Sequence, residues 1–272
     1  YYPLDIFQTN PNMGNFITGV FVAGLVSVVI FGGIQRIAKV ASKLVPFMVG
    51  LYLLAAFIII FKNVEQIPSV FMIIFKDAFS GESVAGGAIG SMIIIGVRRG
   101  LFSNEAGTGT ETMAHGAAKT KEPIREGLVA MLGPFIDTII VCSITALIIL
   151  ISGVYTEDVN GVSMTALAFE NELGILGKVF LIIAVLTFAF STMFGYSFYG
   201  RKCVSYLFGT KAKNIYNCIY VIMIVVASVA SLDIAINFVD SAYALMVIPT
   251  MVATILLSPK VMAEAKLYFS KL

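Results

Sequence analysis

Long runs of apolar residues separated by short polar connections dominate the sequence. Each run has about the 20-residue length that a helix needs to cross roughly 30 Å of hydrocarbon. The runs are apolar around the whole helix, as expected for helices bounded by lipid and by other helices. The pattern predicts an all-α, polytopic membrane protein with seven transmembrane helices, one of them discontinuous. They cover residues 15–33, 44–61, 86–118 (interrupted), 127–152, 176–200, 215–231 and 234–258.

Composition supports this class and argues against a soluble fold. Hydrophobic residues make up 58% of the 272 residues and charged residues only 12%, whereas a soluble domain is about a quarter charged. Closed β-barrels, the other membrane-spanning architecture, alternate polar and apolar residues and lack such long apolar runs. We therefore expect one transmembrane domain over residues 1–272. Because the chain starts with Tyr1 directly before a span, we expect it to be part of a longer protein.

Lysine and arginine are concentrated on alternate connections between the runs. These connections hold 13 basic residues, whereas the opposite connections hold three. Basic loops usually face the cytoplasm, so we expect a multi-pass protein of the cell membrane with these loops inside. The charge is spread over separate loops and gives no indication of nucleic-acid binding. The 13 residues are Arg36, Lys39, Lys43, Lys119, Lys121, Arg125, Arg201, Lys202, Lys211, Lys213, Lys260, Lys266 and Lys271.

The interrupted run contains the clearest candidate for a binding site. An apolar half, residues 86–97, is followed by polar and helix-disfavouring residues at 103–109, near the middle of the membrane. Unpaired backbone groups in hydrocarbon are costly, so a broken helix is tolerated where it lines a polar cavity. Secondary transporters hold substrates and ions in such breaks. A glycine-rich packing face is the alternative, but Ser103, Asn104 and Glu105 within one turn favour a binding site.

Five short motifs follow one another along nearly the whole chain. They are GLFSNEAG at 100–107, AH at 114–115, GLV at 127–129, FIDT at 135–138 and FAFST at 188–192. Together they resemble the sodium:alanine (alanine/glycine:cation) symporter family. The chain differs from the family pattern at Thr110–Glu111–Thr112 and at Glu122, both on the predicted cytoplasmic side. The resemblance implies the leucine-transporter fold of two inverted five-helix repeats.

Within that fold the seven spans would correspond to helices four to ten. Residues 15–61 would then form the last two helices of the first repeat, and residues 86–258 the second repeat. The first three helices would precede the chain. The resemblance further implies sodium-coupled symport of a small neutral amino acid, alanine or glycine, across the plasma membrane. We expect a monomeric functional unit in the lipid bilayer, with sodium as the coupling ion and without a further cofactor.

By the same resemblance, Phe102, Ser103 and Asn104 would line the substrate pocket. Serine and asparagine suit a zwitterion because both form hydrogen bonds without adding net charge. Sodium would bind the Phe188 carbonyl and the hydroxyls of Ser191 and Thr192, whose i, i+3 and i+4 spacing places them on one helix face. The alternative is that these hydroxyls bond only to carbonyls of their own helix.

Charged residues within the predicted spans are further candidates. Asp137 and Asp240 are carboxylates at membrane depth, where charge is expensive and usually functional. One of Arg98 and Arg99 could pair with Asp240 as an outer gate, although a purely structural salt bridge is equally compatible with the sequence. We expect Glu105 to form hydrogen bonds within the break and to hold the unwound backbone.

Other functions have less support in the sequence. A leucine-transporter-type permease with another solute or with proton coupling is the main alternative. An enzyme is disfavoured because the chain has no HExxH or GxSxG motif and no midplane cluster of histidine and aspartate. A channel needs a continuous polar path, usually shared among subunits, and one broken helix is weak support for such a path.

Overall fold

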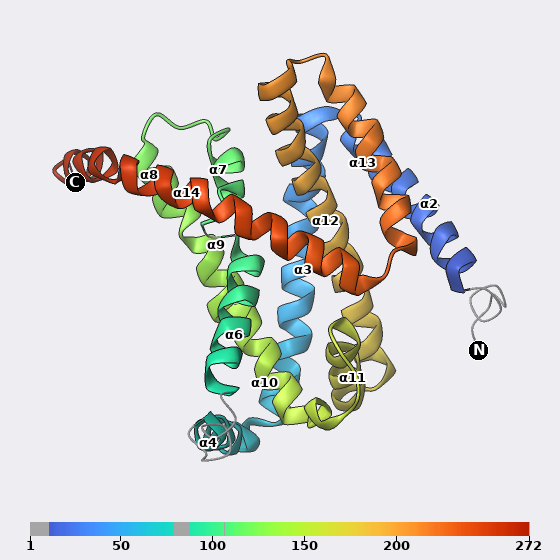
Figure 1. Cartoon of the computed structure of the whole chain (residues 1–272). Helices are drawn as coiled ribbons and strands as arrows, with labels where there is room; N and C mark the ends of the chain where they lie inside the picture. The colour runs from blue at the N-terminus through green and yellow to red at the C-terminus, as the bar shows by residue number, and fades with distance from the viewer. Residues whose placement is uncertain (1–10, 79–87, 106, 272) are drawn as a thin grey trace. The chain divides into compact units, whose positions relative to one another are not determined.

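The regular structure of the described residues consists of helices (Figure 1). The computed structural model describes residues 11–78, 88–105 and 107–271. Helices suit hydrocarbon because their backbone hydrogen bonds are satisfied within one segment. In chain order the elements are α2 (Pro11–Ile30), α3 (Gly33–Lys62), η1 (Val64–Gln66), α4 (Ile67–Ala78), α6 (Ala88–Asn104), α7 (Thr110–His115), α8 (Pro123–Ala130), α9 (Leu132–Pro134), η2 (Phe135–Cys142), α10 (Ser143–Ser152), η3 (Val154–Thr156), α11 (Val162–Leu173), α12 (Ile175–Phe208), α13 (Ala212–Val229) and α14 (Leu232–Phe269).

Six helical segments of the described chain are long and apolar enough to cross a membrane. The predicted class, an all-helical polytopic membrane protein, is therefore confirmed. The seventh predicted span is the interrupted one, which is divided between α6 with 17 residues and α7 with 6. A count of seven spans thus stays a prediction. The six segments are Asn12–Ile30, Gly33–Lys62, Pro123–Ser152, Ile175–Phe208, Ala212–Val229 and Ile234–Phe269.

The junction between the first two spans differs from the predicted boundaries. The sequence indicated one run over residues 15–33, but α2 ends at Ile30 and α3 begins at Gly33. Gly33 has φ 76°, a left-handed conformation that glycine adopts without a Cβ clash. The helix that follows has 30 residues and is longer than the predicted run at 44–61. Lys39 and Lys43 consequently lie within α3 rather than in a loop.

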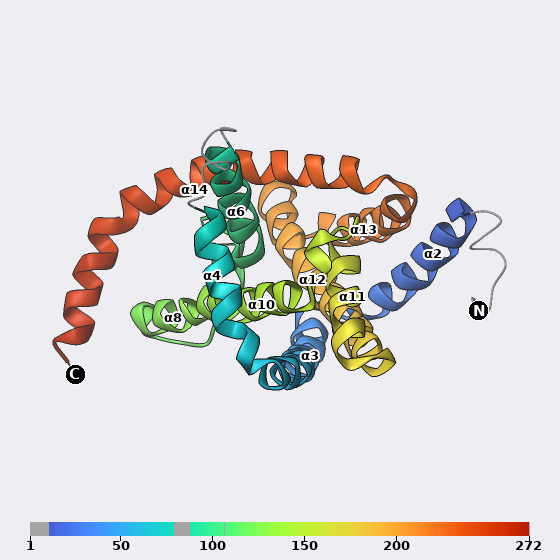
Figure 2. The ribbon, with the colours of Figure 1, turned by 90° about the horizontal axis from the view of Figure 1, so that it is seen from below.

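The segment Pro123–Ser152 forms one long rod, in which α8 and α10 lie along the same line (Figure 2). Its middle part, η2, is π-helical. Pro134 precedes η2, and a proline removes a backbone donor and clashes with the carbonyl four residues earlier. This disturbance favours a local change of helical register. Short π-helical segments are frequent at functional sites, and this one contains Asp137 and Thr138.

The chain divides into two compact units. The first contains the described residues up to Phe47 together with Leu186–Met246, and α2 packs along α13 within it. Van der Waals packing of side chains holds membrane helices together, and one buried cluster in this unit joins α2, α3 and α12. Its core consists of Val26, Ile30, Ile37, Phe194 and Phe198.

The second unit lies within Met48–Val185 and Val247–Leu272. Its core joins the C-terminal half of α3 to α10, α11 and the start of α12, and a hydrogen bond between the hydroxyls of Tyr52 and Thr145 links α3 to α10. This unit contains the interrupted segment. The core residues are Ala55, Ala56, Ile59, Ile148, Val154, Ala168, Phe169 and Leu181.

Candidate functional site

The polypeptide leaves the helical conformation directly after Asn104. Glu105 has φ 55° and is the one non-glycine residue with a positive φ in the described part of the chain. Such a conformation costs an L-residue about 1–2 kcal/mol. Gly107 and Gly109 follow with φ 83° and 85°, and α7 begins at Thr110. The predicted interruption of this helix is therefore present; Ala106 and residues 86–87 lie outside the described residues.

Hydrogen bonds from two threonines hold the broken backbone. The Glu105 carbonyl accepts from the Thr108 backbone N–H at 3.1 Å and from the Thr108 hydroxyl at 2.6 Å. The Thr110 hydroxyl donates to Oε2 of Glu105. Both threonines are buried, with 3% of their surface exposed, so the strained Glu105 conformation is fixed from inside the segment.

The helix α14 supports the same loop. The Thr250 hydroxyl donates to the Thr108 carbonyl at 3.2 Å, and a Cβ added at Gly109 would lie 3.0 Å from the Thr250 hydroxyl. The small glycine therefore allows α14 to approach the break. The sequence did not indicate a role for Thr110 or Thr250, because threonine is common in packed helices and long-range partners cannot be derived from local spacing.

The last turn of α6 is joined to the π-helical segment η2. The Ser103 hydroxyl donates to Oδ2 of Asp137 at 2.6 Å. Nδ2 of Asn104 donates to the Thr138 hydroxyl at 3.2 Å, and this hydroxyl lies 3.4 Å from Oδ2 of Asp137. The structure thus brings together Ser103, Asn104 and Asp137 from the predicted set. Phe102 precedes them on α6, and its side chain is 39% exposed.

The residues predicted to bind sodium lie on α12, in the first unit. The Ser191 hydroxyl donates to the Phe188 carbonyl at 2.8 Å, which is the intrahelical bond that serine and threonine often form. Thr192 is partly buried, whereas the Phe188 side chain is 54% exposed. The hydroxyl oxygen of Ser191 retains lone pairs for another partner, so a role in ion binding stays a prediction.

The predicted gate residues lie in separate units. Arg98 and Arg99 are exposed residues of α6, in the second unit, and Asp240 is a partly buried residue of α14, in the first. The two units are defined separately, each by the contacts within it. Pairing between either arginine and Asp240 therefore stays a prediction.

A second group of polar side chains lies on α7 and α8. Nδ1 of His115 lies 2.7 Å from Oε1 of Glu126 on α8, and this contact connects the two helices across the intervening loop. Within the described residues, Oε2 of Glu111 is buried without a hydrogen-bond partner. The same part of the chain has no group of three or more His, Cys, Asp or Glu side chains arranged to hold a metal ion.

These features define a multi-pass helical membrane protein in which one helix opens into a polar, hydrogen-bonded break. The sequence model of the sodium:alanine symporter family matches residues 4–272. The chain therefore belongs to the sodium:alanine symporter family, which is a family of transporters rather than enzymes.

Curated relatives support this assignment. The sodium/alanine symporter AgcS of Methanococcus maripaludis is 39% identical over 268 residues, covering 97% of the chain and 59% of the relative. The probable sodium/glutamine symporter GlnT of Bacillus subtilis is 37% identical over 254 residues, covering 92% and 53%. A sodium/proton-dependent alanine carrier protein of Bacillus sp. is 38% identical over 218 residues, covering 75% and 49%. The chain thus spans between about half and three-fifths of the length of these relatives.

Proposed function

We propose that the full-length protein carries out sodium-coupled symport of a small neutral amino acid, alanine or glycine, across the plasma membrane. The observation that carries this proposal is the break after Asn104, where polar side chains line an interrupted helix. Family membership supports cation-coupled amino-acid symport in general. The names of AgcS and of the alanine carrier from Bacillus sp. support alanine in particular.

In this proposal Phe102, Ser103 and Asn104 bind the substrate. The Ser103 proton is directed to Asp137, which leaves the lone pairs of the serine oxygen as acceptors. The ammonium group of an amino acid is a suitable donor for them. Asn104 donates one N–H to Thr138, and an asparagine amide can both donate hydrogen bonds to an amino acid and accept them from it. Phe102 would cover a small side chain, and Asp137 would position Ser103.

Sodium would bind at Phe188, Ser191 and Thr192. A carbonyl and two hydroxyls are the hard, neutral oxygen ligands that this ion accepts, and the spacing places them on one face of α12. Sodium would replace the intrahelical bond of Ser191 to Phe188. The ion favours transport only to the extent that it binds one conformation more tightly than the other.

The remaining architecture belongs to the same proposal. Seven spans would represent helices four to ten of a five-plus-five inverted-repeat transporter, with residues 15–61 in the first repeat and 86–258 in the second. The basic loops would face the cytoplasm, and one of Arg98 and Arg99 would pair with Asp240 at an outer gate. The functional unit would be a monomer.

A second candidate is a permease of the same fold with another solute or with proton coupling. The name of GlnT refers to glutamine, and that of the Bacillus sp. carrier refers to both sodium and protons. Glutamine has a longer side chain than alanine and ends in a carboxamide, so a glutamine carrier needs a larger pocket with hydrogen-bond partners for that amide.

The test is uptake of radiolabelled alanine, glycine and glutamine by the full-length protein in proteoliposomes. An inward sodium gradient, an inward proton gradient and no gradient are compared. The proposal predicts alanine or glycine uptake that requires sodium. Glutamine uptake with alanine excluded would favour the second candidate on substrate, and uptake driven by protons without sodium would favour it on coupling.

A further inference from the structure

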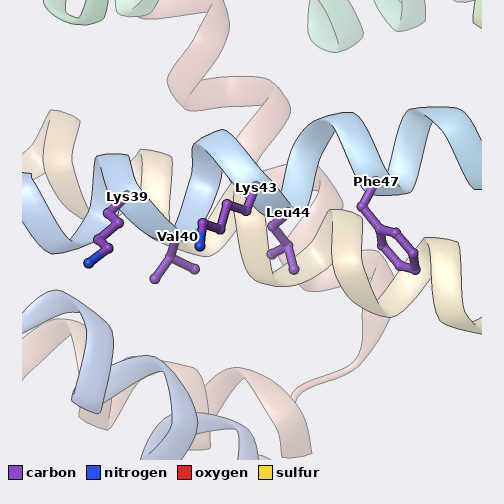
Figure 3. Close-up of a pocket in the computed structure, with 5 residues that line it drawn as sticks. All are labelled: Lys39, Val40, Lys43, Leu44 and Phe47. Atoms are coloured by element: carbon purple, nitrogen blue, oxygen red, sulfur yellow. The ribbon is translucent and has the colours of Figure 1, made fainter.

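A cavity of about 380 Å³ lies along the N-terminal half of α3, within the first unit. The lining positions recur at i, i+4 and i+8 and at i+1 and i+5, so they share one helix face. Figure 3 shows the five side chains extending from the same side of α3. They are Lys39, Val40, Lys43, Leu44 and Phe47.

The cavity has a basic part and an apolar part. Val40 and Leu44 pack against the buried cluster of the first unit, and Phe47 is 58% exposed at the far end. Lys39 and Phe47 are eight positions apart, or about 12 Å along a helix axis. The cavity is thus an apolar groove with two lysines toward the start of α3.

The positive charge of this groove has no acidic partner in the described chain. The ammonium groups of Lys39 and Lys43 take part in no salt bridge or hydrogen bond there. The same unit carries five more basic residues, and Asp240 on α14 is the one acidic side chain described in it. The five are Arg36, Arg201, Lys202, Lys211 and Lys213.

Nearby contacts place several of these basic residues at the same end of the unit. Nη1 of Arg201, near the end of α12, lies 3.8 Å from a Cβ built at Gly33, the first residue of α3. Nη1 of Arg36 donates to the Val28 carbonyl of α2. The start of α3 and the end of α12 therefore form one basic end, next to the lysines of the groove.

The position of the groove fits the boundary between headgroups and hydrocarbon. The apolar run at 44–61 begins directly after Lys43, so the lysines lie where a membrane helix leaves the hydrocarbon. Lysine side chains at this level reach the interface with their charged ends. Clusters of basic residues beside a transmembrane helix attract anionic lipid headgroups.

We propose that this groove binds one anionic phospholipid. The phosphate lies between the ammonium groups of Lys39 and Lys43, and an acyl chain follows Val40, Leu44 and Phe47. A free inorganic anion would use the lysines but not the apolar wall, whereas a zwitterionic lipid would leave the net positive charge unbalanced. This assignment does not depend on which solute the protein carries.

The experiment uses lipid quenching in the full-length protein. The 272-residue chain contains no tryptophan, so Phe47→Trp adds a fluorescent reporter in the groove. Its signal is obtained by subtracting the fluorescence of the parent protein. The protein is reconstituted in phosphatidylcholine vesicles with increasing brominated phosphatidylglycerol, or with the same fractions of brominated phosphatidylcholine. We expect half-maximal quenching at a roughly thirtyfold lower fraction of the anionic lipid, from two lysines near the surface.

Charge variants test the basic half of the groove. Lys39→Gln with Lys43→Gln should abolish the preference for the brominated anionic lipid, and Lys39→Arg with Lys43→Arg should retain it. Lys260→Gln with Lys266→Gln removes the same charge from α14, outside the groove, and should leave the preference unchanged. The Arg and α14 variants distinguish loss of the lipid from loss of the fold.

Three results would overturn the proposal. Equal quenching by both lipids in the Phe47→Trp protein would show that charge does not select the occupant. A preference that survives the paired glutamine variant would place the anionic lipid elsewhere. A reporter quenched by neither lipid would show that another part of the protein fills the groove.

Discussion

The hydrogen bond between Ser103 and Asp137 provides the sharpest test of the substrate site. The Ser103 hydroxyl donates to Oδ2 of Asp137 at 2.6 Å, and a hydroxyl that donates to a carboxylate forms a charge-assisted hydrogen bond. Such bonds contribute about 1.5–3 kcal/mol, compared with about 0.5–1.5 kcal/mol for neutral pairs. Asp137→Asn should therefore weaken the hydrogen bond to Ser103 by about 1 kcal/mol. If Ser103 binds the substrate, the KM for alanine should rise about fivefold.

A double-mutant cycle separates positioning from general damage. Ser103→Ala removes the donor, so adding Asp137→Asn to it should cause little further loss. The expected interaction energy is about 1 kcal/mol, within the range for residues in direct contact. The assay is sodium-driven alanine uptake by the full-length protein at varied alanine concentration. Asp158→Asn, at an exposed loop carboxylate, is the matched control and should leave KM unchanged.

The positioning role would be refuted if the two losses simply add. Additive losses would mean that Asp137 does not act through the Ser103 hydroxyl. An effect on the maximal rate with an unchanged KM would also contradict it, because the hydroxyl is proposed to bind substrate directly. The folding of each variant is checked by its monodispersity in detergent.

Three further predictions concern the break, the ion and the gate. Thr110→Val removes the donor to the Glu105 carboxylate and should lower the free energy of unfolding by about 1–3 kcal/mol, seen as a lower melting temperature in detergent. Ser191→Ala should raise the sodium concentration for half-maximal uptake roughly tenfold, from loss of one ligand worth about 1.4 kcal/mol. Arg98→Asp and Asp240→Arg should each reduce uptake, and the double swap should restore part of it.

Each of these predictions has a control or a contradicting result. Thr112→Val removes an exposed hydroxyl that bonds to the Gly109 carbonyl, and should change stability less than the Thr110 variant. Ser197 bonds to Phe194 as Ser191 does to Phe188, so Ser197→Ala should leave the sodium dependence unchanged. An equal shift in both serine variants would contradict the sodium site. A double charge swap no better than the single variants would remove the gate pair.

The sequence predicted the helical membrane class and the broken helix because both follow from local properties. Apolar runs of span length need no tertiary information, and the residues around Glu105 disfavour a helix by themselves. The boundary at Gly33 could not be placed by hydrophobicity, because glycine is compatible with an apolar run. Its left-handed φ is a property of the folded backbone.

Long-range partners could not be predicted from spacing. Asp137 was identified as a costly intramembrane carboxylate, but its bond to Ser103 joins residues 34 positions apart. Thr250 supports the break from more than a hundred residues away, and no local motif indicates this contact. The groove beside Lys39 likewise could not be predicted, because the sequence placed Lys39 and Lys43 in a loop and the structure places both in α3.

The most direct test of the account is an experimental density map of the full-length protein with alanine and sodium. The account predicts a non-helical backbone from Glu105 to Gly109 and density for alanine beside Ser103 and Asn104. Such a break needs a polar neighbour, because hydrocarbon cannot satisfy free peptide groups. A continuous helix through these residues, packed against its neighbours without a cavity, would contradict the account.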